Sequence, residues 1–555
     1  MSNNGHPVTL SPRHLVTPSP LYLVTFALAG LLLLLSCRVV DRVLQSDPSS
    51  VGRDEAVYLV GSQPRTLDPA LTHGGPDGPL GHLFSGLVTL DTDLQVQPDL
   101  AAGWTVSDDG LVYTFFLRQH ARFHDGRPVT AADVVYSWER AADPATGSDT
   151  AATYLGDIVG VQDMLNGTAD HISGLRMLDD YTLEVRLTAP IVYFLAKLAY
   201  PVTFVVDRDN VSRRDWEHQP NGAGPFKLQS WRDDEIMVLA RNENFYLAPA
   251  HIRHLVYRLG PGLPLAMYED GEIDLVGVGG DTLERVLDPN DPLAPELLTG
   301  VSMCTSVIGM NNRLPPLDDV RVRQAFNYAL DKELLIEAFS GGNALPAMGS
   351  LPPGMPGYSG DAGGYPFKPE LARRLLAAAG YEERDADGRL VGFPVLQYTT
   401  SGYGEANDFV TAVITLWQEE LGVTIEPVLI EPYTYLDELY AGNVGHFFSS
   451  GWCADYPDPQ NFLDVLYHSG SRQNLGGFAD PAVDEMLERA RVERDVAARL
   501  ALYADIEKKI VNQAPVIFVS HGMAAVLVKP YLHGYVLTPI GVPQWHRVTL
   551  ARRDE

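Results

Sequence analysis

The chain has 555 residues, enough for roughly three to four domain-sized lobes, which excludes a single small module. Hydrophobic residues make up 45% and charged residues 20%, proportions typical of a packed globular protein and not of a disordered one. The net charge of −30 would repel a polyanion, so we expect no nucleic acid as a partner.

The chain begins with an apolar run typical of an export signal. The run covers residues 21–35, which is shorter than the about 20 residues of a membrane span but fits a secretion signal. The Leu-Leu-Ser-Cys that follows resembles the lipobox of bacterial lipoproteins, in which the cysteine is diacylated and the signal is cleaved just before it. We expect a lipoprotein signal peptide at 1–36, lipidation of Cys37 and a polar, lipid-anchored tether at 37–54. Alternatively, the run stays as an uncut signal anchor and Cys37 is an incidental thiol.

Beyond residue 55, short β-rich runs alternate with turn clusters and predict strands at 57–60, 111–117, 183–187 and 236–239. Apolar residues at helical spacing, with Pro in the first turn and Gly just past the end, predict a helix over 369–380. Similar spacing predicts a helix over 319–339, with Asp318 or Asp319 as its N-cap, and one or two helices over 486–511. Strands and helices without strict alternation indicate an α/β or α+β fold divided into lobes.

The chain carries no familiar enzyme signature. A Gly-x-Ser-x-Gly elbow, a His-Glu-x-x-His motif and a Gly-Lys-Ser/Thr phosphate loop are all absent from the sequence. His120 and His124 are four residues apart, a spacing that more often marks surface or hydrogen-bonded core histidines than a metal site. The three cysteines, at 37, 304 and 453, match no zinc-ligand spacing. We therefore expect no catalytic residue, no metal site and no cofactor.

A series of turn and aromatic segments occurs in a fixed order and carries a family resemblance. The segments are Pro-Arg-Thr-Leu-Asp-Pro at 64–69, Leu-Phe-Ser-Gly-Leu at 83–87, Leu-Ala-Ala-Gly-Trp at 100–104, Tyr-Thr-Phe-Phe-Leu-Arg at 113–118, Phe-His-Asp-Gly-Arg-Pro-Val-Thr-Ala-Ala-Asp-Val at 123–134, Gly-Ala-Gly-Pro-Phe-Lys at 222–227, Arg-Asn-Glu-Asn-Phe-Tyr at 241–246, Gly-Glu-Ile-Asp at 271–274 and Asp-Val-Arg-Val-Arg-Gln-Ala at 319–325. With them the chain resembles the bacterial family 5 solute-binding proteins of ABC importers, closest to the oligopeptide-binding branch, over nearly all of its mature length.

Most of these segments are interpreted as structural. The Phe-His-Asp-Gly at 123–126 predicts a tight turn, in which Gly allows a positive φ and Asp bonds its own backbone. The segment 222–225 predicts a rigid bend between lobes, in which glycines absorb unusual dihedral angles and a proline fixes one.

The resemblance implies a three-lobed, mixed α/β periplasmic-binding-protein-like fold (type II, cluster C) with a hinged ligand cleft. We expect lobe I to comprise 55–90, 222–303 and 523–555, lobe II to comprise 91–221, and lobe III to comprise 304–522. It implies an extracytoplasmic, lipid-anchored monomer that captures oligopeptides in the cleft and delivers them to a membrane permease and its ATPase. Ligand contacts to both lobes would shift the population to a closed form, and no bond would be broken.

The segment 451–459, Gly-Trp-Cys-Ala-Asp-Tyr-Pro-Asp-Pro, joins aromatic faces, carboxylates and two rigid prolines. In the oligopeptide branch a similar segment presents an Asp to the α-ammonium group of the peptide, which implies this role for Asp455. From the residues alone, Asp455 or Asp458 reads as a turn-capping carboxylate. Trp452 and Tyr456 offer flat apolar walls for a ligand or, equally well, belong to the core.

Some positions depart from the family pattern. His73 falls where relatives have a second acidic residue that assists the amine-binding Asp, and Tyr440 and Ser450 replace basic residues that can meet a peptide carboxylate. The resemblance therefore establishes neither the length of the ligand nor that the ligand is a free peptide. Two alternatives stay open: the same fold binding a non-peptide solute such as a metal chelate, sugar or opine, and a secreted enzyme or sensor without transport.

The two remaining cysteines are expected to pair. If Cys37 carries the lipid of an exported protein, Cys304 and Cys453 are left, and relatives in the peptide branch have a matched pair. We therefore predict a disulfide between Cys304 and Cys453. In the alternative, they are two buried, inert thiols.

Overall fold

The structure is a computed structural model that describes residues 51–72, 75 and 78–551. The chain divides into two units, Met1–Arg53 and Asp54–Glu555, and the second unit holds nearly all of the described residues. The predicted signal peptide at 1–36, Cys37, most of the tether and His73 lie outside the described residues. Among the helices of the described part, none combines the length and the apolar character that crossing a membrane requires.

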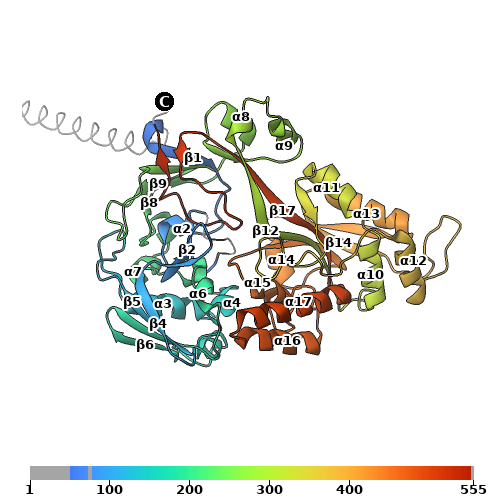
Figure 1. The fold of residues 1–555 in the computed structure, drawn as a ribbon, viewed down its shortest axis with the longest axis horizontal. Helices are drawn as coiled ribbons and strands as arrows, with labels where there is room; N and C mark the ends of the chain where they lie inside the picture. Colours follow the sequence, from blue (N-terminus) through green and yellow to red (C-terminus); the bar gives the residue numbers. More distant parts are fainter. Residues whose placement is uncertain (1–50, 73–74, 76–77, 552–555) are drawn as a thin grey trace, which may run out of the picture. The chain divides into compact units, whose positions relative to one another are not determined.

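The second unit is built on one large mixed sheet (Figure 1). The sheet has 11 strands. In spatial order, ten of them are β15 (Ile425–Ile430), β14 (Leu396–Ser401), β16 (Phe447–Cys453), β12 (Leu297–Met310), β17 (Val516–Val528), β11 (Leu275–Gly277), β1 (Ala56–Val60), β10 (His254–Arg258), β9 (Ile236–Arg241) and β8 (Phe226–Arg232), while β13 (Ala344–Pro346) pairs with β17. The antiparallel strands β12 and β17 are the longest and join the two halves of the sheet.

Residues 88–186 form smaller sheets of their own. A four-stranded antiparallel sheet has the order β4 (Ala101–Val106), β5 (Val112–Leu117), β7 (Thr182–Arg186) and β6 (Leu175–Asp179). The short strands β2 (Val88–Leu90) and β3 (Val96–Pro98) pair with each other. Near the end of the chain, β18 (Leu532–His533) pairs with β19 (Thr549–Leu550).

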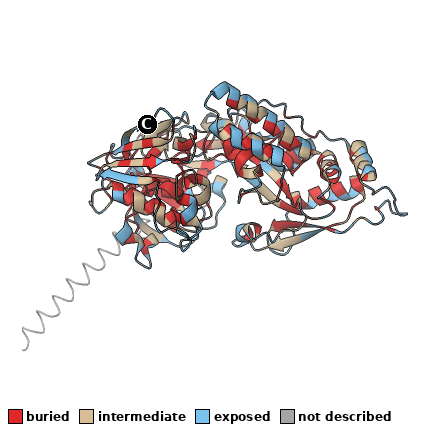
Figure 2. Cartoon of the chain, turned by 90° about the horizontal axis from the view of Figure 1, so that it is seen from below, coloured by how far each residue is buried: buried red, intermediate tan, exposed pale blue. Residues whose placement is uncertain are grey.

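Helices cover these sheets. The N-terminal part holds α2 (Leu80–Leu83), α3 (Ala131–Ala142), α4 (Ala151–Leu155), α5 (Val161–Leu165), α6 (Phe194–Lys197), α7 (Arg208–Val211), α8 (Pro264–Glu269) and α9 (Gly280–Leu287). The C-terminal part holds α10 (Val320–Tyr328), α11 (Lys332–Ser340), α12 (Pro369–Ala378), α13 (Asp408–Leu421), α14 (Tyr435–Tyr440), α15 (Gln460–Tyr467), α16 (Pro481–Val492) and α17 (Val496–Gln513). Figure 2 shows buried residues on the inner helix faces and along the strands, and exposed residues on the outer helix faces.

The predicted strands are confirmed as β1, β5, β7 and β9, and the helix predicted over 369–380 is confirmed as α12. The single helix predicted over 319–339 is wrong, because the segment forms two helices, α10 and α11. Asp319 caps α10 by accepting a hydrogen bond from Arg321 N (2.8 Å), as expected, but Asp331 accepts from Leu334 N (3.0 Å) and starts a second helix. A mid-segment Asp therefore acts as a second N-cap.

Two segments of the N-terminal half of the chain need glycine, each for a different structural reason. Gly126 adopts a φ of 97° and closes the predicted tight turn, with Gly126 N donating to Phe123 O (2.9 Å). The glycines of the 222–225 segment are needed for a different reason than expected. Their φ angles are not in the left-handed region, but a Cβ on Gly222 would lie 1.9 Å from Leu83 O and one on Gly224 would lie 2.3 Å from His82 O. The backbone of this segment therefore packs directly against α2.

Candidate functional site

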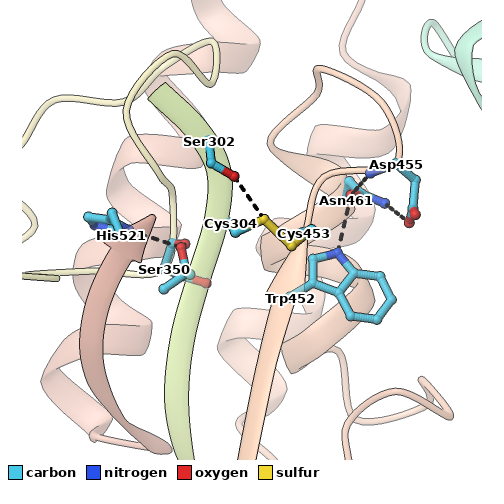
Figure 3. The surroundings of a disulfide bond; sticks show 9 residues. Ser302, Cys304, Ser350, Trp452, Cys453, Asp455, Asn461 and His521 are labelled. Carbon is cyan, nitrogen blue, oxygen red and sulfur yellow. Dashed lines mark hydrogen bonds between the residues drawn. A yellow bond between two sulfur atoms is a disulfide. The ribbon is translucent and has the colours of Figure 1, made fainter. Parts of the chain in front are cut away.

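The strand pair β12 and β16 fixes the start of the 451–459 segment. Cys304 lies opposite Cys453 in the antiparallel register, and the two form a disulfide, as predicted. Figure 3 shows this disulfide at the end of β16, where the chain leaves the sheet and turns toward Asp455. Ala454 N donates to Met303 O (2.8 Å), which continues the pairing by one residue. The position of Asp455 is therefore set by the sheet and by a covalent link two residues earlier.

Asn461, in the first turn of α15, holds the turn closed from the other side. Its side-chain oxygen accepts hydrogen bonds from Asp455 N (2.9 Å) and Trp452 Nε1 (3.2 Å), and its Nδ2 donates to Asp455 Oδ2 (3.1 Å). Figure 3 shows these three side chains gathered beside the disulfide. Because Asn461 is fully buried, this network orients the Asp455 carboxylate with little freedom.

Tyr154 reaches Asp455 from α4, about 300 residues earlier in the chain. Its hydroxyl donates a short hydrogen bond to Asp455 Oδ2. The Tyr154 ring stacks on Tyr200 with centroids 3.8 Å apart and meets Tyr456 edge to face at 6.3 Å. These stacked rings hold the hydroxyl in place, so the carboxylate is bonded from two separate parts of the chain.

The carboxylate of Asp455 has hydrogen bonds but no cation beside it. Burial raises its pKa to about 6, and the hydrogen bonds from Tyr154 and Asn461 oppose that rise. Among the described residues, no Lys, Arg or His nitrogen forms an ion pair with this carboxylate. A partly buried carboxylate without a counter-ion is destabilised, and a bound cation would remove that cost.

Asp458, the other carboxylate of the segment, has a structural role. It forms a two-bond ion pair with Arg499 of α17, at 3.0 and 2.6 Å, and both side chains are almost fully buried. It also accepts a hydrogen bond from Gln460 N (3.0 Å) at the start of α15. The turn-capping role that the residues alone allowed for Asp455 or Asp458 thus belongs to Asp458, whose charge is fully used inside the protein.

The other predicted site residues lie at different depths. Ser450 and Trp452 line one cavity, together with Phe448, Phe462, Tyr467 and other residues of α15 and the 473–478 loop. Tyr440 is half-buried, and its pKa is raised by burial and by the nearby charges of Asp149 and Asp455. Tyr456 is fully buried, with its ring parallel to Tyr193 and its hydroxyl donating to Gln460 Oε1 (2.5 Å). Its ring packs edge to face against Tyr154, on which the Asp455 hydrogen bond depends.

The structure adds site residues that sequence reasoning did not find. Tyr154 and Asn461 hold the carboxylate, and Arg472 pairs with Asp149 at 2.7 Å beside Tyr440. Asn461 stands two positions after the quoted segment and could have been found there as a polar residue on a buried helix turn. Nothing in the sequence around Tyr154 links it to a residue 301 positions away.

The histidine pair singled out by its spacing has separate structural partners. His120 Nε2 lies 3.0 Å from Tyr246 O, and His124 Nε2 lies 3.1 Å from Gly224 O. Within the described ranges, no group of three or more His, Cys, Asp or Glu side chains is arranged to hold a metal ion.

The chain belongs to the bacterial extracellular solute-binding proteins, family 5, whose sequence pattern matches residues 95–474. It is 32% identical to the periplasmic oligopeptide-binding protein OppA of Escherichia coli, over 88% of this chain and 91% of OppA. It is 31% identical to a probable deoxycholate-binding periplasmic protein, YgiS, of the same organism, over 86% of this chain and 89% of YgiS.

Solved structures confirm the mixed α/β periplasmic-binding-protein fold. The murein tripeptide binding protein MppA of E. coli superposes with a TM-score of 0.80 at 28% identity, over 91% of this chain and all of MppA. The unliganded open form of MppA superposes less well, with a TM-score of 0.65 at 27% identity, over 91% of this chain and 99% of that one. The conformation described here therefore differs from that open form.

Proposed function

We propose that this protein is the extracytoplasmic solute-binding component of an ABC importer, that it captures oligopeptides by their free α-amine and that it delivers them to a membrane permease. The observation that carries the proposal is the Asp455 carboxylate, which is fixed by Tyr154 and Asn461 and has no cationic partner in the described chain. A peptide ammonium group supplies the missing positive charge and its hydrogen-bond donors. OppA of Escherichia coli, a relative of this chain, is named as a periplasmic oligopeptide-binding protein.

The lobes expected from the sequence give this site a means of closing. The proposed lobe I carries Arg65, which pairs with Asp437 at 2.8 Å, and the proposed lobe II carries Asp149 and Tyr154, which meet Arg472 and Asp455. Asp437, Arg472 and Asp455 all belong to the proposed lobe III. A ligand bound among these contacts favours the closed arrangement, since it interacts with several lobes at once. In this function the protein binds and releases its ligand unchanged and is not an enzyme.

Native mass spectrometry of the purified protein tests the proposal directly. We expect co-purified peptides of mixed sequence, all with a free α-amine, that are displaced by an added synthetic peptide. A protein that carries no peptide and takes up none from a mixed library of free-amine peptides contradicts the proposal.

Peptide affinity is expected to depend on pH through Asp455. The empty site titrates near pH 6, and a bound ammonium group lowers the pKa of Asp455 below that value. Affinity is therefore highest near pH 7, falls by up to tenfold per pH unit below about pH 6, and falls again above about pH 8 as the peptide amine loses its proton. Calorimetry at pH 5 in two buffers of different ionisation enthalpy should show a proton released on binding. Affinity that is constant from pH 5 to pH 7 contradicts this assignment.

The lipid anchor is a second testable part of the proposal. The 21–35 apolar run and the Leu-Leu-Ser-Cys that ends at Cys37 support a cleaved, diacylated N-terminus, and two acyl chains are what stable attachment requires. We expect Cys37→Ala to move the protein from the membrane fraction, or to leave its signal uncut, and radiolabelled palmitate to be incorporated only into the wild type. Labelled Cys37→Ala protein, or an unlabelled wild type, rules the anchor out.

A non-peptide ligand is the second candidate. YgiS is named as a probable deoxycholate-binding protein, and Tyr440 and Ser450 stand here where basic residues could meet a peptide carboxylate. The cavity beside Trp452, lined by Phe448, Phe462 and Phe478, offers an apolar surface to such a solute. Calorimetry with deoxycholate separates the two candidates, since a bile acid has no ammonium group and its binding would not respond to Asp455→Asn.

A further inference from the structure

A second polar cavity lies between the α4 to α6 region and helices α15 and α16. Its volume is about 290 Å³, it opens to solvent, and it shares no lining residue with the cavity beside Trp452. The charged and titratable residues that line it are Asp157, Tyr193, Lys197, Asp464, His468, Arg472 and Arg491. These residues come from segments that are far apart in the sequence, so the cavity exists only where the two regions meet.

The two carboxylates in this cavity are already neutralised. Asp464 is held by Arg491 through two hydrogen bonds, from Nε (2.6 Å) and Nη2 (2.7 Å), and Asp157 is held by Lys197. The side chains of Lys197 and Asp464 are only 4% and 3% exposed. The acidic side chains therefore have little capacity left to bind a cation in the cavity.

Hydrogen-bond donors, in contrast, are left over. Arg491 Nη1 and the remaining Lys197 protons have no further hydrogen-bond partner among the described residues, although Lys197 Nζ lies 5.8 Å from the centre of the Tyr193 ring. The Gln460 side chain uses only its oxygen, which accepts from Tyr456. His468 Nε2 is buried and makes no hydrogen bond, with Glu488 at 3.5 Å as its nearest acid. Arg472 stands half-exposed at the rim, paired with Asp149. Each of the three cationic side chains therefore has one carboxylate partner, and what the lining has in excess is hydrogen-bond donors, not positive charge.

We propose that this cavity is a binding site for a small oxyanion, a phosphate or a carboxylate, which accepts hydrogen bonds from Arg491, Lys197 and Arg472. Oxyanions match this donor set because Arg and Lys make their strongest hydrogen bonds to such acceptors. The net charge of −30 opposes any diffuse gathering of anions, so binding depends on these local donors. A bound anion joins α6 to α16 and supports Gln460, which packs behind the Asp455 turn through Tyr456. The proposal does not depend on the ligand of the Asp455 site.

The test is a titration of the purified full chain with inorganic phosphate and, separately, with succinate, at constant ionic strength maintained with sodium chloride. We expect saturable heat by calorimetry with at least one anion, and a melting temperature that rises with its concentration. Arg491→Lys keeps the charge but loses the two-pronged geometry, and Arg472→Gln removes the rim cation. Each should weaken binding at least tenfold. Arg489→Gln, which removes an exposed cation from the same helix, should bind as the wild type does.

The variants also separate binding from folding. Arg472→Gln changes a half-exposed residue, so it keeps the test valid if Arg491→Lys unfolds, and a wild-type circular dichroism spectrum with a cooperative thermal transition shows that each variant is folded. Saturation by phosphate alone, or by succinate alone, assigns the class of anion. Absence of saturable binding with both anions overturns the proposal, as does an equal loss of affinity in Arg489→Gln, because that result indicates general charge screening.

Discussion

Asp455→Asn is expected to weaken the binding of free-amine peptides by at least about a hundredfold. An ammonium group taken from water into the site loses hydration worth several kcal/mol, and the Asp455 charge is the anion placed to offset that loss. Asn keeps the shape and one acceptor for Tyr154 but loses the charge. Removing one member of a buried charge pair costs about 3 to 5 kcal/mol, and the lower figure suits a carboxylate that keeps part of its surface open to solvent. Calorimetry with a single peptide measures the difference.

The experiment has two matched controls. An N-acetylated copy of the same peptide has no ammonium group, so it should bind the wild type poorly and discriminate little between wild type and Asp455→Asn. Asp505→Asn makes the same change of net charge at an exposed position on α17 and should leave affinity unchanged. If the wild type binds acetylated and free-amine peptides equally well, Asp455 is not an amine anchor and the non-peptide ligand takes first place.

The order of local motifs was enough to predict the fold. The predicted strands and α12 were recovered because each depends on a pattern within a few residues, such as alternating apolar side chains or Pro and Gly at the two ends of a helix. The segment at 319–339 failed for the opposite reason. Its apolar spacing continues through residues 329–331, and only the capping geometry of Asp331 shows that the helix ends and restarts there. Caps are weak signals in sequence because Asp is also common on helix surfaces.

The site divides in the same way. The disulfide between Cys304 and Cys453 was predicted from the two cysteines left over after Cys37 and from the matched pair of the family, and it is confirmed. Asp455 was singled out because it lies in a contiguous, distinctive segment, and its role as an amine anchor stays a prediction. One partner of Asp455 comes from far away in the chain: Tyr154 of α4 reaches the turn that follows β16, a long-range contact that no local pattern encodes. Asp458 shows the converse. It looked interchangeable with Asp455 until the structure placed Arg499 against it and left Asp455 without a cation.

Removing the disulfide is expected to produce the largest loss of stability. The bond joins residues 149 positions apart, and the chain-entropy description assigns about 5 kcal/mol to closing a loop of that length in the unfolded state. The double variant Cys304→Ala, Cys453→Ala should therefore unfold at a markedly lower urea concentration than the wild type. Because Cys453 lies two residues before Asp455, we also expect a smaller loss of peptide affinity in the folded double variant.

The matched control is Ser302→Ala, which removes the hydroxyl that donates to Cys304 Sγ (3.1 Å) and leaves the covalent link intact. Its cost should not exceed about 1 kcal/mol, the value of one ordinary hydrogen bond. A reducing agent should lower the unfolding midpoint of the wild type to that of the double variant and leave the double variant unchanged. If thiol titration finds Cys304 and Cys453 free in protein recovered from an oxidising compartment, no crosslink restricts the unfolded chain. The double variant should then differ from the wild type only by the loss of two small side chains, one half-buried and one exposed.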